Sequence, residues 1–597
     1  MAELWNDIVY TDVMQSDGYV VDYGIFTTYS LDMSTLLSIP FMLGTMTELT
    51  EIAMRSPHLV LEAVNKSTDK FAVFCNAGCI VVPQANSKIY TLLENNVIQI
   101  KLPAKGAGFV NFHPKLWVIK EHNPDTGKRQ IKIVVLSRNL TCSNDIDVAC
   151  ELIGQVGTEP SSDEAKIKHR PLVTFLEWLA DKSLSNGIRN KIRRIIKDLN
   201  TVEYFDLKDS PFVDYAFFPM GITGYDGLED CLKTDMLDHA ADMVVISPFI
   251  DRKTLALMSC SSSKSRKTLI TRHASITDEI LRLFNDNGGV YVPKEVLTDK
   301  VEKDVTVDLH EKVYFIHNSK TNVNHLYLGS TNATQNGFGR NVEFLLKLSF
   351  DGHKTSYDKF RNELINDRKD CIFEQITAVS MDKSTEENPL EELMLRQTID
   401  AISNADVQKQ IDGYCVTIKC KKDKLPKTVV KIYPLGCESK ECILTDNVMF
   451  KNLELAVLTE FYVLSIENIR RVVKIETTGI PIDERDRAIF KSMVDTKGKF
   501  ISYIAFMLTD DTDQYILENH QMVKELMNMT STVKEQEMSV SLYEDMVRMA
   551  YTNPERIVAI RSVIEKADES VIPEHFMELY ASFENVKRQI NRLCARR

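Results

Sequence analysis

Two apolar, β-branched stretches, residues 24–32 and 242–251, each end at an aspartate and pass into a helical spacing of apolar positions. This pattern is typical of a buried strand that leads into a helix. A second strand is predicted after each stretch, over Phe71 to Phe74 and over Lys267 to Thr271. The two stretches therefore each open one half of an α/β fold.

Two further apolar runs, Ile131 to Leu136 and His325 to Leu328, predict another strand in each half. Between the halves, apolar residues at helical spacing predict a connecting helix whose stripe packs on the core. This stripe is formed by Ile188, Ile192, Ile195, Ile196 and Leu199.

The chain beyond the second half changes character twice. A polar, acidic stretch from Asp382 to Glu392 predicts a linker. Alternating or apolar runs then predict a small β-rich module with strands at Tyr414 to Lys419, Thr428 to Tyr433, Phe461 to Ile466 and Arg471 to Thr477. From Asp483 onward the pattern is helical, and the last helix carries the apolar positions Phe576, Leu579, Phe583, Val586, Ile590 and Leu593.

These patterns divide the chain into five predicted segments. They are a first half over 1–160, connecting helices over 161–205, a second half over 206–380, a β-rich module over 395–480 and a helical domain over 481–597. We expect the two α/β/α halves to pack against each other as a pseudo-dimer within one chain. A chain of 597 residues is too long for a single core, which agrees with several folded units.

The composition is that of an ordinary globular protein, with 44% hydrophobic and 26% charged residues. No stretch reaches the roughly 18 apolar residues of a membrane helix. The start of the chain, Met1 to Asp7, is acidic and lacks the pattern of a secretory signal, so we expect a cytoplasmic protein without a membrane partner.

The 12 cysteines do not form a disulfide pattern in so long a chain. Cys415, Cys420, Cys437 and Cys442 form two pairs that resemble a loose zinc site. The offset of five residues between Cys415 and Cys420, however, places their thiols on opposite faces of the predicted strand. We therefore expect no metal and no cofactor.

A net charge of −13 does not suggest a surface coated by nucleic acid. Local basic clusters still matter for a polyanion. One cluster, Arg189, Lys191, Arg193, Arg194 and Lys197, lies on the connecting helix, and another, Lys419, Lys421, Lys422, Lys424 and Lys427, lies on a predicted hairpin. Each is read either as a solvated face or as a contact for phosphates.

One sequence motif occurs twice in the chain. His113-Pro114-Lys115 is followed by Ser137-Arg138-Asn139, and His310-Glu311-Lys312 is followed by Ser330-Thr331-Asn332. A histidine and a lysine two apart on a strand share a face, and a Ser-x-Asn turn can close around the same anion. With 12 histidines, a single His-x-Lys is expected about once by chance, but two copies with the same downstream turn are not.

A phosphodiester needs a nucleophile, donors for its charged oxygens and an acid for the leaving group. His113 and His310 can supply the nucleophile and the acid. Lys115 and Lys312 supply charge, and Asn139 and Asn332 supply amide donors. Ser137 and Ser330 are predicted to bind substrate. This chemistry requires no metal.

With these motifs the chain resembles the phospholipase D superfamily, over roughly residues 20 to 375. Gly329-Ser330-Thr331-Asn332, followed by Asn341-Val342-Glu343, is similar to that family's second motif. The resemblance implies a duplicated phospholipase D-like domain with one site shared by its halves.

The chain departs from the fullest family motif, which has an aspartate five residues after the lysine, because Lys120 and His317 stand there. That absence is similar to the tyrosyl-DNA phosphodiesterase branch and related nucleases. Aligning Asp147-Val148-Ala149 with Asn341-Val342-Glu343 places an alanine opposite the glutamate, so unequal halves are expected.

The resemblance implies that His113 attacks to form a phosphohistidine, that Glu343 orients its ring, and that His310 protonates the leaving group; the reversed assignment is left open. We expect a metal-independent nuclease with DNA as the favoured substrate, in a setting such as bacterial restriction or phage defence. The C-terminal domains are expected to bind a partner protein, a second copy or the nucleic acid. The alternatives are a phospholipase or phosphatidyl transferase, and a catalytically silent nucleic-acid-binding or assembly scaffold.

Overall fold

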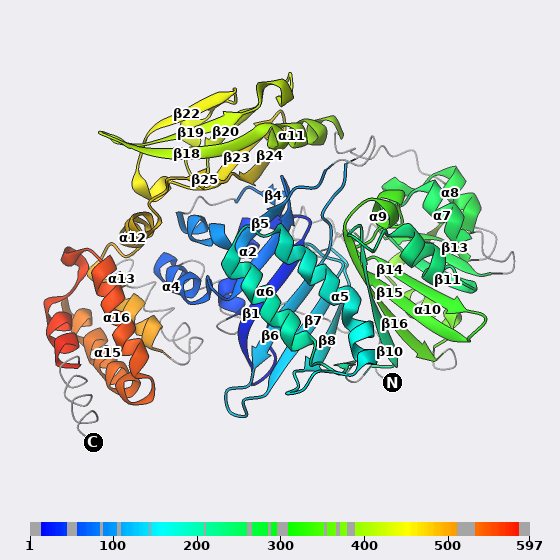
Figure 1. Ribbon diagram of the computed structural model, residues 1–597, viewed down its shortest axis with the longest axis horizontal. Coiled ribbons are helices and arrows are strands. Elements are labelled where there is room, and N and C mark those ends of the chain that lie inside the picture. Colours follow the sequence, from blue (N-terminus) through cyan, green and yellow to red (C-terminus); the bar gives the residue numbers. More distant parts are fainter. Residues whose placement is uncertain are drawn as a thin grey trace. The chain divides into compact units, whose positions relative to one another are not determined.

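The protein is described by a computed structural model, shown in Figure 1. It describes residues 13–43, 56–83, 88–103, 109–142, 145–207, 210–259, 265–284, 288–294, 309–351, 355–365, 371–378, 389–509 and 532–583. The described chain divides into two compact units. The first unit comprises residues 1–35, 70–82 and 96–393, and the second comprises 36–69, 83–95 and 394–597.

The first unit contains a seven-stranded sheet in the order β5-β3-β1-β6-β7-β8-β9. Its strands are β1 (Val20–Thr28), β3 (Phe71–Asn76), β5 (Val97–Ile100), β6 (Leu116–His122), β7 (Arg129–Leu136), β8 (Ala149–Gln155) and β9 (Phe205–Asp206). The strands β5, β3 and β1 run parallel, and β6, β7 and β8 then alternate in direction. The short strands β2 (Leu31–Asp32) and β4 (Ile80–Val81) pair in parallel with each other.

A second sheet in the same unit has eight strands in the order β10-β16-β15-β14-β11-β12-β13-β17. They are β10 (Asp214–Met220), β11 (Ala240–Ile246), β12 (Lys267–Ile270), β13 (Gly288–Pro293), β14 (Val313–Asn318), β15 (Val323–Gly329), β16 (Glu343–Asp351) and β17 (Phe373–Ile376). The parallel run β13, β12, β11 and the alternating run β14, β15, β16 repeat the directions of the first sheet. The strands predicted in each half are therefore present.

Helices cover these sheets, as Figure 1 shows for α5 and α6 across the first. They are α5 (Asp163–Lys182) and α6 (Asn186–Leu199) on the first sheet, and α7 (Arg252–Ser259), α8 (Asp278–Phe284), α9 (Gln335–Gly339) and α10 (Tyr357–Leu364) around the second sheet, with a π-helical stretch, η2 (Leu228–Met236). The helix α2 (Met33–Met42) begins in the first unit and continues in the second. The predicted connecting helix is confirmed as α6, since Ile188, Ile192, Ile195 and Leu199 are buried. A continuous core joins α5, α6 and both sheets.

Two local predictions were wrong. The His-x-Lys triplets precede β6 and β14 instead of lying on them, because the backbone N–H of each histidine bonds outside its own sheet, as described below. The stretch Asp382 to Glu392 was predicted as a linker, but its last four residues belong to a helix. Residues 382–388 lie outside the described residues, and α11 (Pro389–Ala401) begins at a proline, a residue favoured in the first helical turn.

The second unit contains two antiparallel-rich sheets. One has the order β22-β19-β18-β25, from β18 (Ile402–Gln410), β19 (Gly413–Cys420), β22 (Asn447–Leu453) and β25 (Thr477–Thr478). The other pairs β24 (Ile469–Lys474), β23 (Phe461–Ile466), β20 (Lys431–Pro434) and β21 (Cys442–Ile443) in that order. A strand overlaps each of the four predicted ranges of this region, although β20 begins only at Lys431 and β24 ends at Lys474.

Helices complete the second unit. They are α4 (Pro57–Ser67), α12 (Ile482–Met493), α13 (Lys497–Leu508), α15 (Thr532–Thr552) and α16 (Pro554–Lys566), with a helix over 574–583. The predicted apolar positions Val586, Ile590 and Leu593 lie outside the described residues. His58 of α4 contacts Ser502 of α13 at 3.0 Å, so a helix from early in the chain packs within this unit. None of the helices described is long and apolar enough to cross a membrane.

Candidate active site

The two halves of the first unit exchange backbone hydrogen bonds at the His-x-Lys triplets. The N–H of His113 donates to the carbonyl of Val342 at 2.9 Å, and the N–H of His310 donates to the carbonyl of Ile146 at 2.9 Å. Isolated bridges pair Phe112 with Val342 and Ile146 with Leu309 beside them. Each histidine is thus anchored by the other half, which brings the two triplets to one place.

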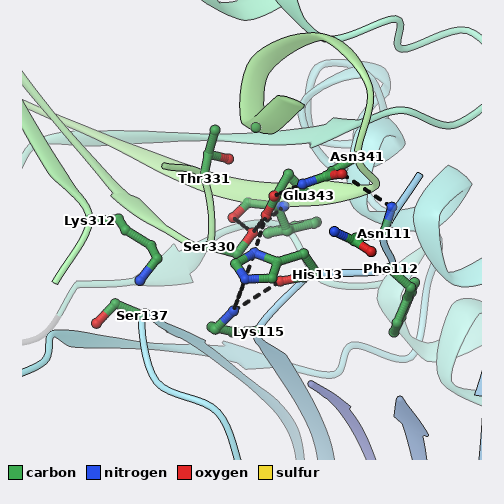
Figure 2. Close-up of polar contacts among 12 residues, drawn as sticks. Asn111, Phe112, His113, Lys115, Ser137, Lys312, Ser330, Thr331, Asn341 and Glu343 are labelled. Carbon is green, nitrogen blue, oxygen red and sulfur yellow. Dashed lines mark hydrogen bonds and ion pairs between the residues drawn. The ribbon is translucent and has the colours of Figure 1, made fainter. Parts of the chain in front are cut away.

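His113 is held by a carboxylate from the second half. Its Nδ1 lies 2.9 Å from Oε2 of Glu343, and its ring centroid lies 5.0 Å from that of Tyr29. The Nζ of Lys115 lies 3.1 Å from Nε2 of His113 (Figure 2). A carboxylate can only accept, so Nδ1 carries the proton in this pair and Nε2 presents a lone pair.

Both carboxylate oxygens of Glu343 accept hydrogen bonds (Figure 2). Its side chain is fully buried, and its Oε1 accepts from the amide of Asn341 at 3.1 Å. Its other oxygen, Oε2, also accepts from the Ser330 hydroxyl. The Oδ1 of Asn341 accepts from the backbone N–H of Asn111 at 3.1 Å, so the same amide ties the glutamate to the first half. This network holds the carboxylate in one orientation toward His113.

His310 has different surroundings. Its Nδ1 lies 2.8 Å from the backbone carbonyl of Ser137, and the Nζ of Lys312 lies 3.4 Å from the same nitrogen. Because a carbonyl accepts, Nδ1 of His310 is the donor and its Nε2 also presents a lone pair. A neutral dipole therefore orients His310, whereas a charged carboxylate orients His113.

The four motif side chains act on one another electrostatically. Burial and then the ammonium of Lys312 lower the pKa of His310 far below its ordinary value, with a further contribution from Lys115. Burial is also the largest cause that lowers the pKa of His113, where Glu343 opposes it and Lys115 and Lys312 add to it. These couplings cross between the halves, so the two triplets form one site.

The two lysines are buried cations. Burial lowers the pKa of Lys115 to about 7, although Glu343 opposes the shift. Burial and the charge of Lys115 lower the pKa of Lys312 well below its ordinary value. An anion between the two lysines would relieve this repulsion, because opposite charge favours the charged form of each amine.

The two Ser-x-Asn turns are built alike. Ser137 and Ser330 are fully buried, and their hydroxyls accept from the backbone N–H of Val148 and Phe344, each at 2.9 Å. These contacts hold the turns. Direct contact of the serines with substrate stays a prediction.

The asparagines of the two turns differ in their contacts. Oδ1 of Asn139 accepts from the N–H of Ser30 at 3.4 Å. Oδ1 of Asn332 is buried and has no hydrogen-bond partner among the residues that the structure describes. This oxygen can accept a hydrogen bond from a bound group, whereas only Nδ2 of the same amide could donate to a phosphate oxygen. No three His, Cys, Asp or Glu side chains in the described parts of the chain are placed to hold a metal ion.

The structure corrects the predicted alignment of the halves. Ile146 and Val342 take the same place, since their carbonyls accept from the two histidines, and Val148 and Phe344 both bond to a turn serine. Asp147, and not Ala149, therefore corresponds to Glu343. The sequence alignment failed because the connection after Ser330 contains α9 and is longer than the one after Ser137.

Two further pairs of residues were missed by sequence reasoning. The hydroxyls of Thr28 and Ser247 accept from the N–H of Leu140 at 3.0 Å and of Ala333 at 2.9 Å. Each hydroxyl thus fixes the residue after a motif asparagine. The only signal in the sequence is a hydroxyl residue at the end of the first strand of each half, which is too common to be noticed alone.

No protein-family model matches the chain, and no curated protein matches it. Among solved structures, the chain is similar to polyphosphate kinase from Porphyromonas gingivalis, with 12% identity over 57% of this chain and a TM-score of 0.30. The similar region spans 41% of the kinase chain, which is less than half its length.

Two other solved structures are similar in part. Phosphatidylserine synthase from Haemophilus influenzae Rd KW20 has 12% identity over 64% of this chain and 88% of its own, with a TM-score of 0.33. NucT from Helicobacter pylori has 19% identity over 24% of this chain and 87% of its own, with a TM-score of 0.19.

Proposed function

We propose that this chain is a phosphodiesterase of the phospholipase D type that cleaves nucleic acid, with DNA as the favoured substrate. The observation that carries the proposal is the union of two His-x-Lys triplets in one site, with His113 held by Glu343 at 2.9 Å. The repeated strand order and the matching turn contacts support a duplicated domain whose halves share this site.

The proposed reaction has two steps. Binding of the anionic diester favours the charged form of His310, which takes up a proton on Nε2. Nε2 of His113 then attacks the phosphorus, the bond to the leaving oxygen breaks, and His310 gives that oxygen its Nε2 proton. Water then attacks the phosphohistidine, loses a proton to His310 and releases His113. Glu343 stabilises the positive charge that develops on the His113 ring, since a carboxylate beside Nδ1 favours the imidazolium.

The cations and amides would bind the phosphate oxygens. In the free protein the Lys115 ammonium lies beside Nε2 of His113. A phosphate oxygen would draw this ammonium away and leave the lone pair free to attack. Lys312 and the side-chain N–H groups of Asn332 would bind the same oxygens from the second half.

The histidine roles can be tested with bis(p-nitrophenyl) phosphate in EDTA. Its good leaving group needs little acid catalysis, so His310→Ala should release about one equivalent of p-nitrophenolate in a burst and then stall. The stalled protein should carry phosphate on His113. A burst in His113→Ala with label on His310 would reverse the roles, and no turnover by the parent would refute the phosphodiesterase.

The substrate class is tested separately. The parent is incubated in EDTA with single- and double-stranded DNA, RNA and phospholipid vesicles. Cleavage of nucleic acid that is lost in His113→Ala supports the proposal, whereas cleavage of lipid alone supports the phospholipase. Binding of nucleic acid without any turnover supports the scaffold. Roles in restriction or phage defence, and binding of partners by the second unit, stay predictions.

A further inference from the structure

The basic residues of α6 divide into two groups. Lys191 lies over the ring of Tyr23, with Nζ 4.7 Å from the centroid, and Arg189 donates to the carbonyl of Leu184 at 3.3 Å. Arg194 and Lys197 are exposed and line a hollow. The cluster is therefore more than a uniform solvated face.

The hollow is formed by α6 together with the adjoining strands and loops. Lys120 of β6 and Arg129 of β7 contribute two further cations, and the remaining lining residues are Gly157, Thr158, Asp198 and Thr201. Its volume is about 460 Å³. This size lies within the range of about 300–1,000 Å³ that is usual for ligand pockets.

The charges of the hollow do not cancel. Asp198 lies 2.8 Å from Nζ of Lys120 and 3.4 Å from Nη1 of Arg129, so one carboxylate holds both strand cations. No carboxylate among the described residues lies within ion-pair distance of Arg194 or Lys197. Four cations thus surround one acid, and the excess positive charge selects an anion.

A simpler account explains only part of this arrangement. Lys197 stands in the last turn of α6, where a cation offsets the negative end of the helix dipole. Lys120 and Arg129, however, come from neighbouring strands and not from the helix. Asp198 neutralises part of their charge, so Arg194 and Lys197 are the cations left for an anionic ligand.

The hollow lies on the half that carries Lys115 but away from the site. Lys120 follows Lys115 by five residues along β6, which corresponds to about 17 Å at the usual rise of a strand. Successive phosphates of one strand of duplex DNA are spaced by about 3.4 Å along the axis. A phosphate in the hollow would therefore be at least about five nucleotides from the scissile bond.

We propose that this hollow binds a backbone phosphate of the nucleic acid outside the active site, and so favours long substrates over short ones. The inference rests on the proposed function, because it assigns the substrate of that site a second contact. A free phosphate or a mononucleotide has the same chemistry but does not reach both places.

The test uses the double variant Arg194→Glu/Lys197→Glu in the full chain, with His113→Ala added to stop turnover. Binding of a labelled 30-base-pair DNA is followed by fluorescence anisotropy at several salt concentrations. The charge reversal should weaken binding at least tenfold near 100 mM salt. It should also reduce the salt slope by roughly one to two, since each phosphate contact contributes about 0.9 for duplex DNA.

Lys166→Glu/Arg170→Glu is the matched control, because both residues are exposed on the neighbouring helix α5 and lie outside the hollow. It should keep both affinity and salt slope. Equal losses in the two double variants, or no loss in either, would overturn the inference. Binding of inorganic phosphate or a mononucleotide that is lost with Arg194 and Lys197, without any change in DNA binding, would also overturn it.

Catalysis provides a second, separable measurement. With His113 restored, the ratio of kcat/KM for the 30-base-pair DNA to that for bis(p-nitrophenyl) phosphate should fall at least tenfold on charge reversal of the hollow. The small diester is too short to reach it. If the parent cleaves neither substrate, the proposed function fails, and the anisotropy result still decides whether the hollow binds DNA.

Discussion

Glu343 and Asp147 occupy equivalent positions in the two halves, and only Glu343 reaches a histidine. Each follows the residue whose carbonyl binds the opposite histidine's backbone N–H. Glu343 contacts Nδ1 of His113 at 2.9 Å, whereas Asp147 lies 3.5 Å from Nη1 of Arg138. Asp147, which has the shorter side chain, is thus paired within its own half. The carbonyl of Ser137 accepts from Nδ1 of His310 instead.

Replacement of Glu343 by glutamine should lower kcat strongly. Glutamine keeps the shape of this fully buried side chain but removes the charge that stabilises an imidazolium at His113. We expect a loss of at least about 100-fold, in line with the large effect of a neutral substitute beside a catalytic histidine. The measurement is kcat with bis(p-nitrophenyl) phosphate, with the thermal midpoint as the control for folding. Unchanged kcat in a folded variant would show that Glu343 does not support the attack.

Asp147→Asn should affect kcat far less, by less than about fivefold. Asp147 is directed toward Arg138 rather than His310, so its charge does not hold a catalytic ring. Burial also raises the pKa of Asp147, which weakens any contribution of its charge. The same assay compares it with Glu343→Gln. Equal losses in the two variants would mean that the halves are equivalent in the reaction, contrary to the geometry.

The strands of the first unit could be predicted because their signals are local. Apolar runs such as Ile131 to Leu136 are buried from end to end, and a strand of this kind is visible in the sequence. The stripe of α6 is equally local. The membership of α4 in the second unit could not be predicted, because an amphipathic helix shows that it packs but not on which partner.

The motif residues of the site could be found because two copies of His-x-Lys, each followed by a Ser-x-Asn turn, are not expected by chance. The correspondence of Asp147 with Glu343 could not, since it depends on hydrogen bonds from His113 and His310 to chain segments in the opposite half. The only sequence trace is an apolar residue followed by an acid, Ile146-Asp147 and Val342-Glu343, at different distances from the turns. Unequal halves were expected. The first half keeps a carboxylate at this position, Asp147, but that carboxylate pairs with Arg138 and not with a histidine.

The pH dependence of kcat/KM should follow Lys115 on the alkaline side. Burial lowers the pKa of Lys115 to about 7, so its ammonium loses its proton as the pH rises above neutrality. Binding of the phosphate then loses a cation, and kcat/KM for the small diester should fall about tenfold per pH unit. On the acid side burial keeps the pKa of His113 below its ordinary value, so the neutral nucleophile persists to a lower pH than it would for an exposed histidine.

Lys115→Arg separates this cause from others, because a guanidinium stays charged throughout the range. The variant should be less active but should show no alkaline fall up to about pH 9. A fall of the same slope and midpoint in both proteins would assign the titration to another group.

In the second unit, a buried ion pair should control stability. Arg485 donates to Oε2 of Glu94 at 2.8 Å, and both side chains are buried. The other oxygen of Glu94 accepts from Thr459 and from the N–H of Glu460, at 2.5 and 2.6 Å. Removal of one partner from such a pair costs about 3–5 kcal/mol, because it leaves the other charge buried without compensation. Arg485→Met should therefore lower the thermal midpoint measurably.

The loss caused by Arg485→Met should grow as the pH rises. Burial raises the pKa of Glu94 and Arg485 opposes this shift, so without Arg485 the folded state holds the proton on Glu94 more tightly still. A carboxyl whose pKa is raised in the folded state stabilises it below the unfolded pKa and loses this contribution as the pH rises. The variant should thus melt closer to the parent at pH 5 than at pH 8. Glu94→Gln is the reference that removes the titrating group, and measured against it Glu94→Gln/Arg485→Met should show the same loss at both pH values. A pH-dependent difference between these two variants would assign the effect elsewhere.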